Sequence, residues 1–174
     1  MLSTQQLVTI GSPWSTMAPL RLGNIPSGLG TADLFVVISD NDLPLLRVDL
    51  YRDASSESAA FQDVVVWHEH VFVGLGHAVY VVEPKAQRGS SIRLESYFAA
   101  FYPGEDYLLV SSADALLRLT ADGTVLWTKH GLGLDGVTVK HIENGLVEGD
   151  AEWDPPRGWK SFRLRLDSGQ LVTD

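Results

Sequence analysis

The chain contains no cysteine and few basic residues, and each shortage excludes a class of function. Without cysteine there are no disulfides, no thiolate zinc sites and no cysteine nucleophile. The 174 residues include 13 lysines and arginines against 22 aspartates and glutamates, which gives a formal net charge of −9. Nucleic acids and anionic membrane surfaces both require a basic footprint, so neither is an expected partner.

Long apolar runs are missing as well. No stretch approaches the roughly 18 apolar residues that a membrane-spanning helix needs. Residues 1–6 have neither the basic start nor the apolar core of a secretory signal. We therefore expect a cytoplasmic protein without membrane contacts. Its hydrophobic share of 45% is that of an ordinary globular domain.

Short apolar segments alternate with clusters of glycine, aspartate, serine and proline. This pattern is typical of an antiparallel, all-β fold. The clearest segments are residues 34–38, 64–67, 71–73, 79–82, 107–110 and 115–119. Only residues 53–61 have the pattern of a short helix. No long crossover helix is indicated, which disfavours a parallel sheet.

The strand pattern repeats along the chain. Three successive four-stranded units have first strands that end at Trp67, Tyr102 and Ile142, a spacing of about 40 residues that is typical of propeller blades. An earlier partial unit covers residues 34–49. Residues 1–31 hold three prolines and little alternation. We therefore expect an irregular N-terminal segment, with one strand near residues 6–10, packed on a single all-β repeat domain of residues 32–174.

Residues 107–127 carry the most blade-like sequence. It runs from Tyr107-Leu108-Leu109-Val110-Ser111 to Ala121-Asp122-Gly123-Thr124-Val125-Leu126-Trp127. This segment resembles one blade of a β-propeller of the pyrroloquinoline-quinone-repeat or WD type, although the Gly-His and Trp-Asp signatures of WD repeats are missing. The resemblance implies an antiparallel meander of propeller-blade-like, four-stranded units. An open or incomplete propeller, a sandwich and a ring completed by a partner all fit it, and it implies no catalytic or cofactor residues.

One hairpin can be paired from its charges. Strand alternation places four carboxylates on one face: Glu148, Asp150, Glu152 and Asp154. If Asp150 pairs with Arg163, then Glu148 pairs with Arg165, and the apolar residues of both strands also face one another. We therefore predict a salt ladder in this register, in preference to a carboxylate cluster that binds a divalent cation.

The same register leaves residues 154–159 as a proline-stiffened loop. Arg157 lies between Trp153 and Trp159 in this segment. Tryptophan and arginine often dominate the binding energy of protein interfaces, and a rigid loop lowers the ordering cost of binding. We predict these three residues as a binding site. In the alternative interpretation both indoles pack on the sheet edge and the prolines only shape the turn.

His68-Glu69-His70 is the one His-x-His motif. On a strand both imidazoles share a face, which suits zinc, manganese or iron. Small all-β cupins have a similar motif, but here the expected glutamate position holds Gly74 or Leu75. The repeat alignment also places the motif in a turn. A metal site at His68 and His70, which His77 could join, is therefore the alternative prediction.

Two hypotheses about function follow. The first is a non-catalytic, acidic β-repeat module without a cofactor that binds another protein, with a basic partner favoured by the charge. An immunity-type antidote for a basic toxin is one example. The second is a small cupin-like, metal-dependent enzyme that uses His68 and His70. An unclosed sheet also has exposed edges, through which the chain could form a homodimer.

Overall fold

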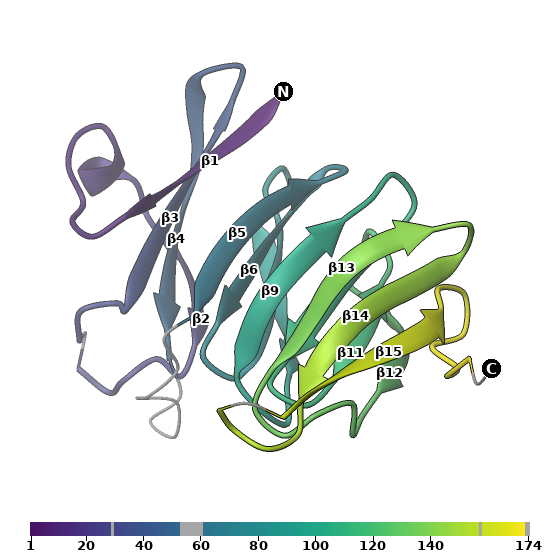
Figure 1. Ribbon diagram of the computed structural model, residues 1–174. Coiled ribbons are helices and arrows are strands. Elements are labelled where there is room, and N and C mark those ends of the chain that lie inside the picture. Colours follow the sequence, from purple (N-terminus) through teal and green to yellow (C-terminus); the bar gives the residue numbers. More distant parts are fainter. Residues whose placement is uncertain (29, 53–60, 157, 173–174) are drawn as a thin grey trace. The chain divides into compact units, whose positions relative to one another are not determined.

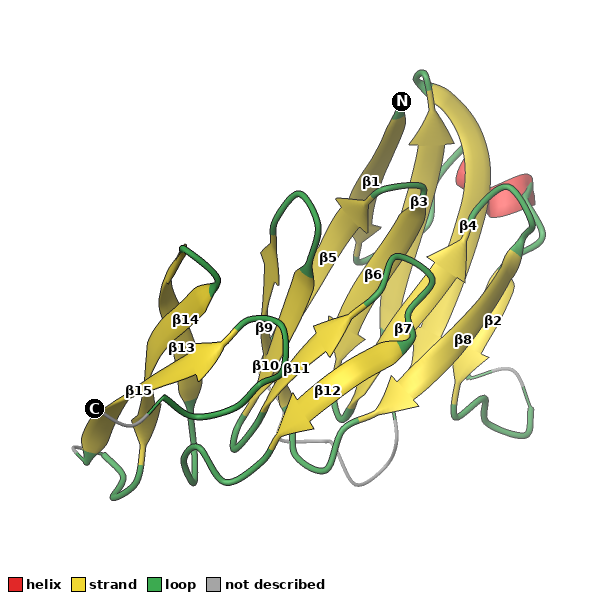
Figure 2. Cartoon of the chain, turned by 90° about the vertical axis from the view of Figure 1, so that its right-hand side faces the viewer, coloured by secondary structure: helices red, strands yellow, loops and turns green. Residues whose placement is uncertain are grey.

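The computed structural model describes residues 1–28, 30–52, 61–156 and 158–172. Within these residues the structure is almost entirely β, and its only helix is the 3-10 turn η1 (Trp14–Thr16), drawn in red in Figure 2. The predicted short helix falls on residues 53–60, which lie outside the described residues. No helix in the described part is long and apolar enough to cross a membrane.

The chain divides into two compact units, Met1–Arg93 and Leu94–Asp174. Each unit contains two β-sheets (Figure 1). The domain boundary that the sequence places at residue 31 stays a prediction.

The first sheet of unit 1 shows where the predicted N-terminal segment was wrong. Its strand order is β1 (Leu2–Leu7), β3 (Leu34–Asp40), β4 (Leu43–Tyr51) and β2 (Leu20–Gly23). The N-terminal segment thus contributes two strands rather than one, and the first overlaps the predicted strand only at residues 6 and 7. Leu2 and Thr4 are half-buried while Ser3 and Gln5 are exposed, so a weak alternation was present in the sequence. β2 pairs with β4 in parallel, which short-range turn signals do not encode.

The second sheet of unit 1 is a simple antiparallel meander. It consists of β5 (Gln62–Trp67), β6 (His70–Leu75), β7 (Ala78–Glu83) and β8 (Arg88–Arg93), in that order. Alternate apolar residues of the two sheets form one core, in which Val36, Val48, Leu50, Val71 and Val73 are fully buried. Burial of this apolar surface is the main stabilising contribution.

Unit 2 also contains two β-sheets. Its first sheet contains β9 (Phe98–Pro103), β10 (Leu108–Ser112), β11 (Leu116–Leu119) and β12 (Val125–Lys129). The second contains β13 (Val137–Glu143), β14 (Leu146–Glu152) and β15 (Trp159–Arg165), which lie side by side in Figure 1. Leu171 adds an isolated bridge to Leu164. The predicted all-β fold of blade-like, mostly antiparallel sheets is confirmed, but the last sheet has three strands and the first contains a parallel pair.

The register of the β14–β15 hairpin differs from the predicted one by two residues. Glu148 pairs with Arg163 rather than Arg165, and Asp150 pairs with Ser161 rather than Arg163. A two-residue slip keeps every side chain on its predicted face and changes only its partner. The predicted salt ladder is therefore wrong: neither predicted pair forms, and of the two carboxylates only Glu148 lies opposite an arginine.

Two local features account for the shift. Gly149 lies opposite Phe162, and a Cβ added to Gly149 would lie 2.5 Å from Cζ of the ring. The ring thus fills the space that the glycine leaves. In the connecting loop, Trp153 N–H donates to the Gly158 carbonyl and Gly158 N–H donates to the Asp154 carbonyl, both at 2.8 Å. The predicted register required Asp154 to pair with Trp159. The turn prevents this pair, because it already closes between Trp153 and Gly158.

Candidate functional site

The predicted binding residues lie at the β14–β15 end of unit 2. Trp153 follows β14 directly and is 38% exposed, while Trp159 begins β15 and is 45% exposed. Arg157, the third predicted residue, lies outside the described residues. Two large apolar rings in contact with solvent are unusual for a structural turn, because an apolar side chain gains about 25 cal/mol for each Å² that it buries.

The two indoles do not share a face of the hairpin. Trp159 pairs with Glu152, whereas the ring of Trp153 lies 5.3 Å from the ammonium of Lys160. Successive residues of a strand point to opposite faces, so Lys160 and Trp159 project from opposite sides. The structure therefore places the two tryptophans on the two sides of the loop rather than in one cluster.

Trp159 forms a row across the end of the sheet with Glu152 and Gly136. Gly136 accepts a hydrogen bond from Glu152 N–H at 2.9 Å. A Cβ added to Gly136 would lie 3.1 Å from Cη2 of Trp159 and 3.8 Å from Cβ of Glu152. Since Glu152 lies on the middle strand of the three, the indole reaches Gly136 by extending across it. This explains why Glu152 is only 9% exposed.

The connection between β12 and β13 runs past the same row. Leu134 N–H donates to the Glu152 carbonyl at 2.6 Å, and its side chain is 61% exposed. The next residue, Asp135, accepts a hydrogen bond from the hydroxyl of Tyr97 at 2.9 Å. Burial and this hydrogen bond raise the pKa of Tyr97 to about 12, and the charges of Asp135 and Glu152 act in the same direction. Asp135 and Glu152 thus add negative charge close to Trp159.

Three side chains that can ligate a metal lie near this end. One ligand atom from each of Glu95, Asp114 and His130 lies within 4.8 Å of the others. Asp114 already accepts hydrogen bonds from the hydroxyls of Ser96, at 2.5 Å, and Ser112, at 3.3 Å. Glu95 and His130 are exposed and lie 3.6 Å apart. The cluster can take up a cation, and it makes this end of unit 2 more acidic.

Backbone hydrogen bonds hold these segments together. Ala113 N–H donates to the Tyr97 carbonyl at 3.2 Å, and Leu132 N–H donates to the Asp114 carbonyl at 3.0 Å. Together with the bond between Leu134 and Glu152, they link four connections of unit 2. We call the surface that they form the loop end. It consists of Glu95, Asp114, His130, Leu134, Asp135, Glu152, Trp153, Asp154 and Trp159.

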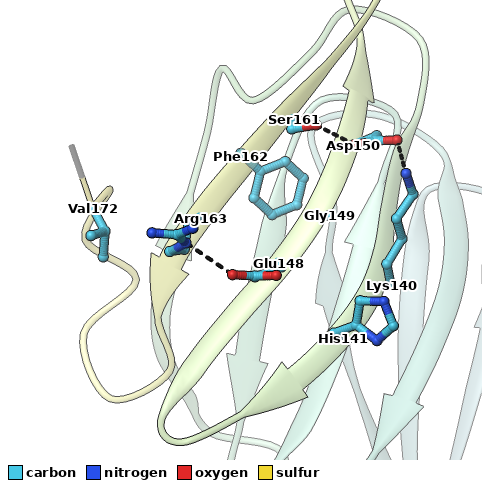
Figure 3. A pocket seen from close by; sticks show the side chains of 9 residues that line it. All are labelled: Lys140, His141, Glu148, Gly149, Asp150, Ser161, Phe162, Arg163 and Val172. Atoms are coloured by element: carbon cyan, nitrogen blue, oxygen red, sulfur yellow. Dashed lines mark hydrogen bonds and ion pairs between the residues drawn. The ribbon is translucent and has the colours of Figure 1, made fainter. Parts of the chain in front are cut away.

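The other carboxylates of β14 differ from Glu152 in having partners. Glu148 accepts from Arg163 at 2.9 Å, and Asp150 accepts from Ser161 at 2.9 Å and from the ammonium of Lys140 (Figure 3). These donors hold the pKa of Asp150 below its usual value, with the lysine contributing most. Both carboxylates thus have donors within unit 2, although not the arginines that the predicted ladder gave them.

The His-x-His motif covers the two-residue turn between β5 and β6 and the first residue of β6. Trp67 pairs with His70, which leaves His68 and Glu69 as the turn, and His68 has a φ of 54°. The strand alternation that would place both imidazoles on one face is therefore broken between them. Within the described residues, neither histidine belongs to a group of three ligand-type side chains. Metal binding by His68, His70 and His77 stays a prediction without support from this geometry.

Sequence analysis missed Leu134, Asp135 and the role of Glu152. The segment Gly131-Leu132-Gly133-Leu134-Asp135-Gly136 belongs to none of the predicted strands or motifs. An exposed leucine between glycines was the available signal. Nothing local indicates that this segment lies beside Trp159, because the contact spans more than 20 residues of sequence.

Comparison with known proteins identifies the fold. No protein-family model matches the chain, and no curated protein matches it. Apo AztD from Citrobacter koseri, a β-propeller protein, is similar in structure with a TM-score of 0.53 and 12% identity, over 82% of this chain and 42% of that one. The Pan2 WD40 domain from Neurospora crassa gives a TM-score of 0.49 and 9% identity, over 83% and 47%.

The chain spans less than half the length of these solved chains. Identity this low carries information about the fold and not about ligands or partners. The structural similarity to AztD and the antiparallel sheets that follow one another along the chain together confirm the propeller-like resemblance seen in the sequence. The protein has an all-β, propeller-like fold.

Proposed function

We propose that the protein is a non-catalytic binding module and that the loop end of unit 2 contacts a basic protein partner. The observation that carries this proposal is the combination of exposed apolar groups with carboxylates at one end of unit 2, with the two indoles on opposite sides of the hairpin. Leu134, Trp153 and Trp159 are all more than a third exposed. Asp135 and Glu152 lie beside them. Exposed aromatics within a rim of charge are typical of protein interfaces.

Charge supports a basic partner. The whole chain carries a net charge of −9, and the loop end has five carboxylates: Glu95, Asp114, Asp135, Glu152 and Asp154. Complementary charge raises association rates and disfavours partners of the same sign. An immunity-type antidote for a basic toxin is one partner class that fits these charges. A cupin-like enzyme is not favoured by any contact described above.

Photo-crosslinking from the loop end tests the proposal. A benzophenone amino acid replaces Leu134, whose exposed side chain points away from the core, and the protein is exposed to a lysate of its source organism. We expect a basic protein to be crosslinked from position 134. The crosslink should disappear when Trp159 is also replaced by alanine, because truncation of a central aromatic typically costs about 2 kcal/mol or more of binding free energy.

A matched control replaces apolar groups that are exposed elsewhere in unit 2. Val125 and Leu126 lie on the edge strand β12, and a V125S/L126S variant removes comparable exposed apolar surface. This variant should retain the crosslink from position 134. A crosslink that survives Trp159→Ala, or partners that are acidic as often as basic, would contradict the proposal.

A further inference from the structure

We propose that Glu152 and the indole of Trp159 form a receptor for one lysine or arginine side chain. The proposal rests on the function proposed above and names the chemical group of the partner that the loop end recognises. Its basis is a contrast along β14, where two carboxylates have cationic partners and a third, more buried carboxylate has none.

Glu152 is nine-tenths buried and lacks a partner. Its exposed fraction is 9%, the highest degree of burial among the carboxylates of β14. In the part of the chain that the structure describes, no side chain or backbone donor is hydrogen-bonded to its carboxylate. The carboxylate oxygens are not among the fully buried polar atoms of the described residues, so a ligand can approach them from solvent. A cation supplied from outside can therefore pair with Glu152 without displacing an internal partner.

The neighbouring cations of unit 2 are engaged elsewhere. Lys140 pairs with Asp150, and Arg163 pairs with Glu148. Lys160 lies over Trp153, on the opposite side of the hairpin. Asp135 adds negative charge in the same region, since Asp135 and Glu152 both raise the pKa of Tyr97. The surroundings thus favour a positive ligand and oppose an anion.

The form of the site favours an organic cation over a metal ion. The indole of Trp159 extends over Glu152 toward Gly136, because a Cβ placed on Gly136 would contact both the ring and Cβ of Glu152. Ammonium and guanidinium groups are attracted to the face of tryptophan, and each also donates hydrogen bonds to a carboxylate. A divalent cation instead needs several oxygen or nitrogen ligands, and the indole supplies none. A lysine or arginine side chain can contact the indole of Trp159 and the carboxylate of Glu152 at the same time.

Nuclear magnetic resonance titration with short peptides tests the receptor. The probes are acetylated pentapeptides of glycine with a central lysine, arginine or glutamate, and the reporter is the indole N–H signal of Trp159. We expect the lysine and arginine peptides to shift this signal and the glutamate peptide to leave it unchanged. Glu152→Gln should weaken binding of the basic peptides by at least about 10-fold, because the buried charge pair is lost.

Glu143→Gln is the control variant. It removes one carboxylate at the opposite end of the same sheet, so its net charge equals that of Glu152→Gln. Its affinity for the peptides should stay within about twofold of the wild type, which is the size of a surface charge effect. Equal weakening in both variants would overturn the receptor and leave only general attraction to an acidic protein.

The two proposals can fail separately. If the crosslink from position 134 depends on Trp159 but survives Glu152→Gln, then the loop end binds a partner by apolar contacts, and the cation receptor is wrong. If the peptides bind in a Glu152-dependent manner but no crosslink forms, the receptor stands and the protein-docking function is wrong. If the Trp159 signal responds to none of the peptides, the receptor is also overturned.

Discussion

Unit 1 and unit 2 each bury one carboxylate, and the two are treated differently. Asp49 in β4 is 4% exposed and receives two hydrogen bonds from Arg47, at 2.7 and 2.8 Å. The guanidinium also lies 5.5 Å from the centre of the Phe35 ring. Glu152 in β14 has an aromatic neighbour too, but no cation among the described residues. These two are the buried carboxylates of the described chain.

The difference separates a structural carboxylate from one that is available for a ligand. Asp49 and Arg47 satisfy each other within one strand, so the pair requires nothing from outside. Glu152 is likewise a buried residue with an aromatic neighbour, but it has no cation beside it among the described residues. Charged groups left without partners in a folded protein cost stability and are often retained at binding sites.

Removal of the charge from Asp49 is the largest expected effect. Asp49→Asn leaves the guanidinium of Arg47 without its anion at a site where the arginine side chain is 15% exposed. Breaking a buried pair in this way typically lowers the free energy of unfolding by about 3–5 kcal/mol. Chemical denaturation of the variant and the wild type measures the difference.

Lys85→Ala is the comparison for that variant. Lys85 and Glu69 also form an ion pair in unit 1, at 2.6 Å, but their side chains are 58% and 74% exposed. We expect its loss to change stability by no more than about 1 kcal/mol. Similar losses for Asp49→Asn and Lys85→Ala would remove the distinction between a buried structural pair and a surface pair.

Gly149→Ala tests the register on which the position of Glu152 depends. The added Cβ would lie 2.1 Å from the Thr138 carbonyl oxygen and 2.5 Å from the Phe162 ring. Overpacking of this kind costs about 1–3 kcal/mol of unfolding free energy. Gly11→Ala is the control, because nothing lies within 4 Å of its added Cβ. A neutral Gly149→Ala would mean that Phe162 does not lie opposite Gly149.

Glu152→Gln should leave stability nearly unchanged. Its carboxylate reaches solvent and has no internal donor to lose among the described residues, so we expect the free energy of unfolding to change by no more than about 0.5 kcal/mol. Glu148→Gln breaks the partly exposed pair with Arg163 and should lower it by less than about 1 kcal/mol. A loss of stability in Glu152→Gln would show that the carboxylate has a structural role.

The smallest expected effect is on the ionisation of Tyr97. Its pKa in the folded protein is about 12 against an ordinary value of 10.0. The stability contribution of Tyr97 is therefore complete below pH 10 and is lost as the pH rises toward 12. Glu152→Gln should lower this pKa slightly, and Glu148→Gln should leave it unchanged. Tyrosinate absorbance in the two variants measures both, and an equal response would place the Glu152 carboxylate away from Tyr97.

Strand alternation accounts for what the sequence could predict. Residues that alternate in polarity, such as Glu148, Gly149, Asp150 and Ala151, were placed on their observed faces. The choice of partner across the hairpin depended on how Phe162 fits over Gly149 and on the closure of the loop, and neither leaves a periodic signal. The sequence therefore predicts which face of the hairpin each side chain occupies. It does not predict which residue of the neighbouring strand lies opposite.

The candidate site was predictable only in part. Trp153 and Trp159 are rare residue types in a proline-rich loop, so composition alone drew attention to them. The isolation of Glu152 results from which cations reach its neighbours, and Lys140 reaches Asp150 from a different strand. Leu134 and Asp135 belong to the site through backbone and side-chain hydrogen bonds to distant residues. Such tertiary contacts require the folded structure.

The most direct test of the central claim is a crystal structure of the protein with the lysine pentapeptide. The account predicts that the lysine ammonium lies over the indole of Trp159 and within hydrogen-bonding distance of the Glu152 carboxylate, while the pairs of Glu148 with Arg163 and Asp150 with Lys140 stay intact. A lysine bound at one of those paired carboxylates, with Glu152 untouched, would contradict it.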